Sequence, residues 1–186
     1  MSWIDPKIFT LATGGRWLSD PPPSIAGVGI DSRESLTGRL FAAIPGPTHD
    51  GHDYLQEAAL NGAVGAIIER EVPGADLPCF LVEDVRRALS QAGAFYRETL
   101  EGTRVVAITG SAGKTTTRKI LEAVLEPISP GTASPKSFNN DLGVPLTLLS
   151  AKPEDCWLLA EVGTNGTQNE QEGRQSIGTL HRPVFV

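Results

Sequence analysis

One loop in this 186-residue sequence has the residue types and spacing needed to hold phosphate groups. Gly110 and Gly113 let the backbone turn tightly, so that successive N–H groups point at an anion. Lys114 can reach the β- and γ-phosphates of a nucleotide, and the hydroxyl of Thr115 can complete a Mg²⁺ shell. The strict GxxxxGK[ST] pattern is not met, because its first glycine falls on Ile108. A glycine turn beside a solvated lysine is the competing interpretation, and the order strand, loop, helix favours the phosphate loop.

Three other groups of polar residues could take part in chemistry. Glu161 ends the apolar stretch Trp157–Ala160, where phosphate-loop proteins place an acid near the metal, although a strand end can also carry a merely solvated glutamate. The turn 49–53, His-Asp-Gly-His-Asp, has metal-ligand residue types but no third cluster nearby, which favours a loop that positions a substrate or caps a helix. Arg33 suits bidentate phosphate binding or a surface salt bridge, and the sequence leaves both open.

The elements that must position these residues alternate between strand and helix in the first half. Tyr54–Leu60 predicts a helix that ends at Asn61-Gly62, and Asp84 can cap a second helix. The second helix has apolar positions at helical spacing: Val85, Leu89, Ala92, Tyr96 and Leu100. Strands are predicted at Ile25–Ile30, Leu40–Ile44, Gly65–Ile68 and Phe80–Val82.

The second half begins with a predicted buried strand, Val105–Thr109, that runs into the phosphate loop. A helix follows, for which we expect one apolar side made of Ile120, Leu121, Val124 and Leu125. A further helix is predicted over Leu142–Leu149, with Pro145 tolerated in its first turn, and a strand over Trp157–Ala160. The pattern predicts an α/β protein with a parallel sheet behind the loop.

The amino-acid composition argues against several classes of protein. With 16 Lys and Arg against 22 Asp and Glu, the net charge of −6 argues against a general binder of nucleic acid. There is no run of about 18 apolar residues, and the N-terminus lacks the pattern of a signal peptide, so we expect no membrane insertion. Cys79 and Cys156 lie outside any CxxC spacing, which argues against a disulfide scaffold and fits the cytoplasm.

Five ordered blocks between about residues 25 and 165 resemble the Mur ligase family. The loop around Lys114 resembles the T-G-x-x-G-K-T nucleotide loop of that family. Two blocks of the first half, Asp31–Ala43 and Gly46–Tyr54, are similar to its D-S-R…G-x-L-F-x-A and G-x-x-x-D-G-H blocks. Lys136–Leu149 and Glu161–Asn165 resemble blocks of the member that joins D-Ala-D-Ala to UDP-MurNAc-tripeptide.

The resemblance implies ATP-driven amide formation in peptidoglycan precursor synthesis, by a cytoplasmic monomer. The substrate carboxylate would attack the γ-phosphate, and the amine of D-Ala-D-Ala would displace phosphate from the acyl phosphate. Lys114 is the implied catalytic residue, and Thr115 and Glu161 would serve Mg²⁺. The implied ATP-binding residues are Gly110, Ser111, Ala112, Gly113, Lys114, Thr115, Thr116, Asn139 and Asn140. The implied substrate-binding residues are Ser32 and Arg33, which would face the UDP-sugar, and Asp50, Gly51 and His52, from the segment 50–53 that would shape that site.

After Asn165 the sequence departs from the family, because the polar stretch Gly166–Gln175 is unlike the family's continuation. We therefore expect a small α/β substrate domain over residues 1–102, then an incomplete parallel-sheet ATP-binding domain over 103–186, unable to complete ligation alone. One alternative is the ligase that adds the third amino acid, which would carry Thr-Thr-Pro in place of Phe138-Asn139-Asn140. The other is a non-catalytic module that binds a nucleotide or a UDP-sugar.

Overall fold

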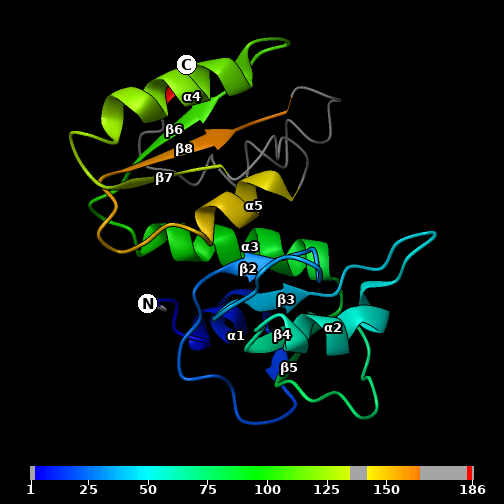
Figure 1. Cartoon of the computed structure of the whole chain (residues 1–186). Coiled ribbons are helices and arrows are strands. Elements are labelled where there is room, and N and C mark those ends of the chain that lie inside the picture. Colours follow the sequence, from blue (N-terminus) through cyan, green and yellow to red (C-terminus); the bar gives the residue numbers. More distant parts are fainter. Residues whose placement is uncertain (1–2, 135–141, 164–183, 186) are drawn as a thin grey trace. The chain divides into compact units, whose positions relative to one another are not determined.

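The computed structural model describes residues 3–134, 142–163 and 184–185, and the chain divides into two compact units, residues 1–92 and 93–186 (Figure 1). Each unit is an α/β fold built on a largely parallel sheet, as the sequence predicts. The division falls within helix α3 (Val85–Glu98), whereas the predicted boundary at residue 102 follows that helix. None of the helices in the described part of the chain is long and apolar enough to cross a membrane.

The first unit has a five-stranded sheet in the order β1-β5-β4-β3-β2. Its strands are β1 (Arg16–Trp17), β2 (Val28–Gly29), β3 (Leu40–Ala42), β4 (Gly65–Ile68) and β5 (Cys79–Leu81). Only the edge strand β1 runs antiparallel to its neighbour. Its helices are α1 (Lys7–Thr13), the 3₁₀ turn η1 (Gly51–Tyr54), α2 (Leu55–Leu60) and the start of α3. All four residues of β4 are buried, so both faces of this sheet are covered.

The second unit has a four-stranded parallel sheet in the order β7-β8-β6-β9 (Figure 1). Its strands are β6 (Arg104–Ile108), β7 (Gly131–Ala133), β8 (Trp157–Glu161) and β9 (Val184–Phe185). Helices α4 (Lys114–Leu125) and α5 (Gly143–Leu148) lie on opposite faces of this sheet. Because Ile108 is paired with Glu161, β6 and β8 end at the same edge, next to the loop that follows β6.

Successive side chains of β8 point to opposite faces of the sheet. Trp157 and Leu159 pack with Ile108, Leu121 and Leu125 in the core under α4. Since side chains alternate along a strand, Glu161 also points to the face that α4 covers. The apolar pattern of β8 therefore aims its one acidic side chain at the helix that follows the phosphate loop.

The structure confirms most of the predicted elements. β4 has the predicted bounds, and Asp84 caps α3, because its Oδ1 accepts the Arg87 N–H at 2.9 Å. The predicted strand Ile25–Ile30 is shortened to β2. The sequence did not predict α1, β1 or β7, because α1 is a single short helix and each strand is two or three residues long with no apolar alternation.

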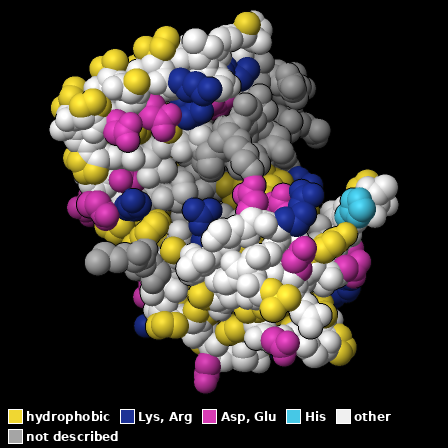
Figure 2. All heavy atoms as spheres, viewed as in Figure 1, with side chains coloured by type: hydrophobic (Ala, Val, Ile, Leu, Met, Phe, Trp, Pro, Cys, Tyr) yellow, Lys and Arg dark blue, Asp and Glu magenta, His cyan; other side chains and the backbone are white. Residues whose placement is uncertain are grey.

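The predicted apolar side of α4 is correct for two of its four residues and wrong for the other two. Leu121 and Leu125 pack against the sheet, but Ile120 is 59% exposed and Val124 is 57% exposed. Consecutive residues differ by about 100° around a helix, so both pairs cannot face one sheet. The buried stripe instead includes Arg118, whereas Ile120 and Val124 are exposed. Figure 2 shows hydrophobic side chains on the outer surface of the second unit, over α4.

Candidate functional site

The loop after β6 has the backbone shape that its glycines predict. Gly110 and Gly113 have φ values of 135° and 81°, in the region that favours glycine. Gly113 is the N-cap of α4, so the loop leads directly into the N-terminus of a twelve-residue helix. Lys114 is the first residue of α4, and its Nζ donates a hydrogen bond to the Gly110 carbonyl at 2.6 Å. The lysine therefore lies across the loop that an anion would enter.

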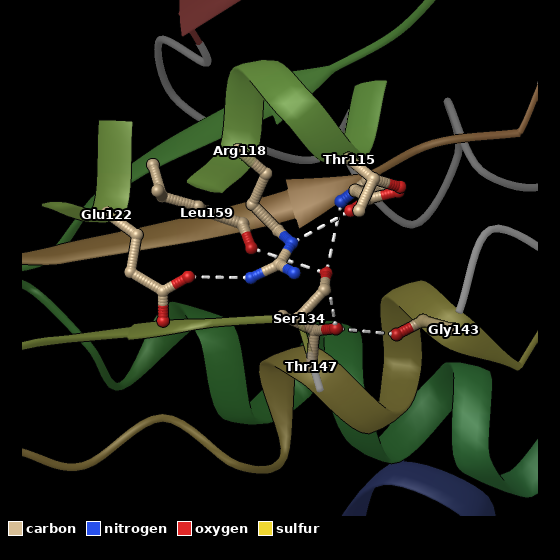
Figure 3. Close-up of polar contacts among 8 residues, drawn as sticks. Thr115, Arg118, Glu122, Ser134, Gly143, Thr147 and Leu159 are labelled. Carbon is tan, nitrogen blue, oxygen red and sulfur yellow. Dashed lines mark hydrogen bonds and ion pairs between the residues drawn. The ribbon is translucent and has the colours of Figure 1, made fainter. Parts of the chain in front are cut away.

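Glu161 lies beside the first turn of α4 with its carboxylate fully buried. Thr115 Oγ1 donates to Glu161 Oε2 at 3.0 Å, and Arg118 Nε donates to Oε1 at 2.8 Å (Figure 3). Thr115 and Arg118 are three positions apart on α4, a spacing that puts both side chains on one face of the helix. The structure thus brings together the two residues for which the sequence predicted a metal role.

Arg118 is a member of this site that the sequence analysis missed. Its side chain is only 9% exposed, and it bridges two carboxylates, since Nη1 also donates to Glu122 Oε2 at 2.7 Å. The signal that could have found it is the spacing Lys114, Arg118, Glu122, which puts a base at i+4 and an acid at i+8 on one side of the helix. The negative charge of the buried Glu161 is therefore compensated by a buried partner.

A chain of buried hydrogen bonds holds the backbone of Glu161 from the other side of the sheet. The Glu161 N–H donates to Ser134 Oγ at 3.0 Å, at the point where β7 has ended. Ser134 Oγ lies 3.0 Å from Thr147 Oγ1, and Thr147 Oγ1 donates to the Gly143 carbonyl at 2.7 Å (Figure 3). Ser134 Oγ also donates to the Leu159 carbonyl at 3.3 Å, so each hydroxyl has a second acceptor and either one can be the donor between the two side chains. These contacts link the end of β8 to α5.

Three of the remaining predicted nucleotide residues lie on the loop and the start of α4. Ser111, Ala112 and Thr116 are exposed. Asn139 and Asn140 lie outside the described residues. The exposed loop atoms are therefore accessible to a ligand, while Glu161 and Arg118 are not exposed to bulk solvent.

In the first unit, Ser32 and Arg33 follow β2 and already have partners. Ser32 is buried, its hydroxyl donates to the carboxylate of Glu57, and its carbonyl accepts the side-chain N–H of Asn61 at 2.7 Å. The Arg33 side chain is 79% exposed and is held bidentately by Asp31 at 2.8 and 2.7 Å. The hydrogen bonds to Asp31 raise the pKa of Arg33 above its usual value. Arg33 is thus an accessible cation in a fixed orientation.

The turn with Asp50, Gly51 and His52 follows β3, the neighbour of β2, so it lies at the same edge of the sheet as Ser32. Asp50 Oδ1 accepts the His52 N–H at 3.0 Å and contacts His52 Nδ1 at 2.6 Å, and Oδ2 pairs with Arg70 at 2.8 Å. Chiefly because of the hydrogen bond from the His52 backbone, the pKa of Asp50 is lowered to about 2.

The side chain of His52 links this turn to the backbone of Glu69. It is buried, and its Nε2 accepts a hydrogen bond from the Glu69 N–H at 2.9 Å. The ring proton is therefore on Nδ1, which donates a hydrogen bond to the Asp50 carboxylate. Both ring nitrogens are therefore engaged within the protein. A Cβ at Gly51 would lie 2.5 Å from the backbone N of Ile44, so only glycine fits where the turn meets the end of β3.

Comparison with known proteins gives the family. The Mur ligase family catalytic-domain model matches residues 24–97, and the Mur ligase middle-domain model matches residues 108–177. The chain belongs to the Mur ligase family. Each of the two matches falls largely within one structural unit, so the division of the chain agrees with the domain order of Mur ligases.

Two curated Mur ligases represent the relatives of this chain. The UDP-N-acetylmuramoyl-tripeptide–D-alanyl-D-alanine ligase of Haemophilus influenzae is 33% identical over 82% of this chain and 34% of its own length. The UDP-N-acetylmuramoyl-L-alanyl-D-glutamate–2,6-diaminopimelate ligase of Bacillus licheniformis is 43% identical over 55% of this chain and 21% of its own length. The chain thus spans about a third of the length of the former relative.

Solved Mur ligase structures share this fold. The D-alanyl-D-alanyl-adding ligase from Acinetobacter baumannii has a TM-score of 0.81 and 32% identity, covering 95% of this chain and 40% of that protein. The MurF ligase from Thermotoga maritima, solved in complex with ADP, has a TM-score of 0.63 and 31% identity, covering 84% of this chain and 35% of that protein.

Proposed function

We propose that this chain is the substrate- and ATP-binding part of the Mur ligase that joins D-Ala-D-Ala to UDP-MurNAc-tripeptide. The observation that carries the proposal is the junction of the phosphate loop with Thr115 and Glu161, which provides an anion cradle and a carboxylate at one sheet edge. The relative from Haemophilus influenzae and the structural neighbour from Acinetobacter baumannii are both named for this reaction, which supports the choice of substrate.

The donor atoms at this junction fit Mg²⁺. Thr115 Oγ1 and Glu161 Oε2 are hard oxygen ligands 3.0 Å apart. In an octahedral Mg²⁺ shell with 2.0–2.1 Å bonds, neighbouring ligands lie about 2.9 Å apart. Within the described residues, no three His, Cys, Asp or Glu side chains gather, so nucleotide phosphates and water would supply the remaining ligands, as Mg²⁺ prefers. Bound there, Mg²⁺ would neutralise charge on the phosphates.

The residues of this chain act on ATP mainly by positioning and by charge. The loop amides and the N-terminus of α4 face the phosphates, and Lys114 would exchange its hydrogen bond to the Gly110 carbonyl for one to a phosphate oxygen. Phosphoryl transfer to a carboxylate needs aligned reactants and neutralised charge more than it needs a base. The Thermotoga maritima relative was solved in complex with ADP, which supports a nucleotide as a ligand of this chain.

The first unit is the proposed site for the UDP-sugar. Arg33 presents a planar fork of donors suited to a diphosphate, and it would leave Asp31 to bind one. Ser32 and the turn Asp50–His52 shape the same edge of the sheet. We place the chain in the cytoplasm, where ATP and UDP-sugars are used and where Cys79 and Cys156 stay reduced, and we propose that it acts as a monomer.

The ligase that adds the third amino acid is the second candidate. It is favoured by the 43% identity to the Bacillus licheniformis enzyme, although that match covers a shorter part of this chain. Phe138-Asn139-Asn140 favours the first candidate, since the second would carry Thr-Thr-Pro there. UDP-MurNAc-dipeptide and UDP-MurNAc-tripeptide share the diphosphate that Arg33 would bind, so a comparison of their affinities reports on contacts beyond it. Tighter binding of the tripeptide would favour the first candidate, and tighter binding of the dipeptide would favour the second.

Calorimetric titration of the whole chain with ADP, in Mg²⁺ and in EDTA, tests the nucleotide proposal. The wild type should bind ADP more tightly in Mg²⁺. Thr115→Val should lose that gain while its ADP affinity in EDTA stays unchanged, because only a metal ligand is removed. Thr117→Val, on the same helix, is the matched control and should behave as wild type. Equal binding with and without Mg²⁺ in the wild type would contradict a metal-assisted nucleotide site.

A further inference from the structure

The two oxygens of the Glu161 carboxylate are not equivalent. Oε2 faces the Thr115 hydroxyl, a neutral group that can give up its hydrogen bond by rotating. Oε1 accepts the Arg118 Nε–H at 2.8 Å, from a cation with a side chain that is only 9% exposed. A charge-assisted hydrogen bond of this kind is roughly twice as strong as a neutral one. Oε2 is therefore the oxygen that can be released to another ligand.

Arg118 cannot easily turn away from Oε1, because it is held at a second point. Its Nη1 donates to Glu122 Oε2 at 2.7 Å, one helical turn further along α4 (Figure 3). The guanidinium is planar and its donors have fixed directions, so bonds at Nε and Nη1 fix its orientation. Glu122 thus anchors the arginine that holds one half of the carboxylate.

We propose that Arg118 is a positioning residue that makes Glu161 bind a cation through Oε2 alone and so favours Mg²⁺ over Ca²⁺. This inference rests on the proposed nucleotide site. Mg²⁺ takes six ligands in near-ideal octahedral geometry, whereas Ca²⁺ takes six to eight and accepts both oxygens of one carboxylate. A cation that spans both oxygens of Glu161 would meet the positive charge of the guanidinium on Oε1. Single-oxygen binding leaves that pair intact.

The test measures ADP affinity of the whole chain at saturating Mg²⁺, at saturating Ca²⁺ and in EDTA. Arg118→Met frees Oε1, and Arg118→Lys keeps the charge but cannot bridge both carboxylates, so the second variant decides if the first does not fold. Two exposed positions serve as controls: Lys119→Met also replaces a cation on α4 by methionine, and Arg104→Lys makes the same exchange as Arg118→Lys.

In both Arg118 variants, ADP affinity in Mg²⁺ should fall about tenfold, the size expected for loss of a partner behind a metal ligand. Affinity in Ca²⁺ should fall much less, and affinity in EDTA should not change. Glu122→Gln should shift the Ca²⁺ to Mg²⁺ ratio in the same direction by a smaller factor. Equal losses under all three conditions, as for contact with the nucleotide or general loosening, would overturn the inference, and so would an unchanged ratio. A wild type without metal dependence would instead defeat the proposed function, and this inference with it.

Discussion

Ser134→Ala should destabilise the second unit although it removes a single oxygen atom. The Ser134 side chain is 2% exposed and accepts the Glu161 N–H at 3.0 Å, in the place where a carbonyl of β7 would stand if that strand continued. Alanine keeps the shape of the backbone and leaves almost no cavity. The change therefore removes only the polar contacts of one hydroxyl behind the carboxylate of the site, namely those with the Glu161 N–H, the Leu159 carbonyl and Thr147 Oγ1.

The expected loss of unfolding free energy follows from the hydrogen-bonding groups that Ser134→Ala leaves without a partner. In Ser134→Ala the buried Glu161 N–H loses its acceptor, which costs about 1–3 kcal/mol of unfolding free energy. Thr147 loses its contact with Ser134 Oγ but keeps its own bond to the Gly143 carbonyl, and the Leu159 carbonyl keeps the Ser134 N–H at 2.8 Å, so these losses add little. Ser150→Ala is the matched control, because its hydroxyl donates to the Thr147 carbonyl at 2.7 Å in a half-buried position, and that carbonyl still accepts the Ser150 N–H at 3.1 Å after the change. Its cost should stay below about 1 kcal/mol.

Urea denaturation followed by circular dichroism gives both free energies of unfolding, and amide hydrogen exchange reports on Glu161 itself. Exchange of the Glu161 N–H should become faster in Ser134→Ala and stay slow in Ser150→Ala. If Ser134→Ala costs no more than Ser150→Ala and leaves exchange at Glu161 slow, the hydrogen bond from β8 to Ser134 does not hold this strand end.

Two further predictions concern the first unit. The pKa of Asp50 is lowered from 3.8 to about 2, so its contribution to stability is complete above about pH 4 and is lost as the pH falls toward 2. The difference in unfolding free energy between wild type and Asp50→Asn should accordingly shrink on acidification, and a difference independent of pH would refute this role. Arg33→Ala should weaken binding of UDP-MurNAc-tripeptide and leave ADP affinity unchanged; an NMR titration in which the ligand shifts only residues beyond about 105 would contradict the assignment.

The sequence predicts the strand that aims Glu161 and the loop that holds Lys114, because both depend on local patterns. Apolar residues at 157, 158 and 159 predict the strand, and glycines beside a lysine predict the turn. Pairing between β6 and β8 joins residues about fifty positions apart, which no local pattern encodes. The meeting of Thr115 with Glu161 was thus expected from the family pattern and not from spacing.

Arg118 and His52 show why the other features of the candidate site could not be predicted from the sequence. Arg118 looks like a solvated base on an amphipathic helix until the buried face of α4 is known, and that face depends on the sheet. His52 was expected to help shape the UDP-sugar site, and the sequence does not reveal that the Asp50 carboxylate and the Glu69 N–H occupy both of its nitrogens. Hydrogen-bond partners distant in sequence decide the state of buried polar groups, and only the fold reveals them.

The central claim, a nucleotide held by the loop after β6, is tested most directly by ADP binding in Mg²⁺ to wild type, Lys114→Ala and Lys119→Ala. Lys114 faces the loop, whereas Lys119 is exposed further along the same helix, so the two variants lose equal charge. A charge-assisted hydrogen bond is worth about 1.5–3 kcal/mol, so Lys114→Ala should raise the dissociation constant about 10- to 150-fold. Lys119→Ala should leave it nearly unchanged. Equal affinities for wild type and Lys114→Ala would contradict the account.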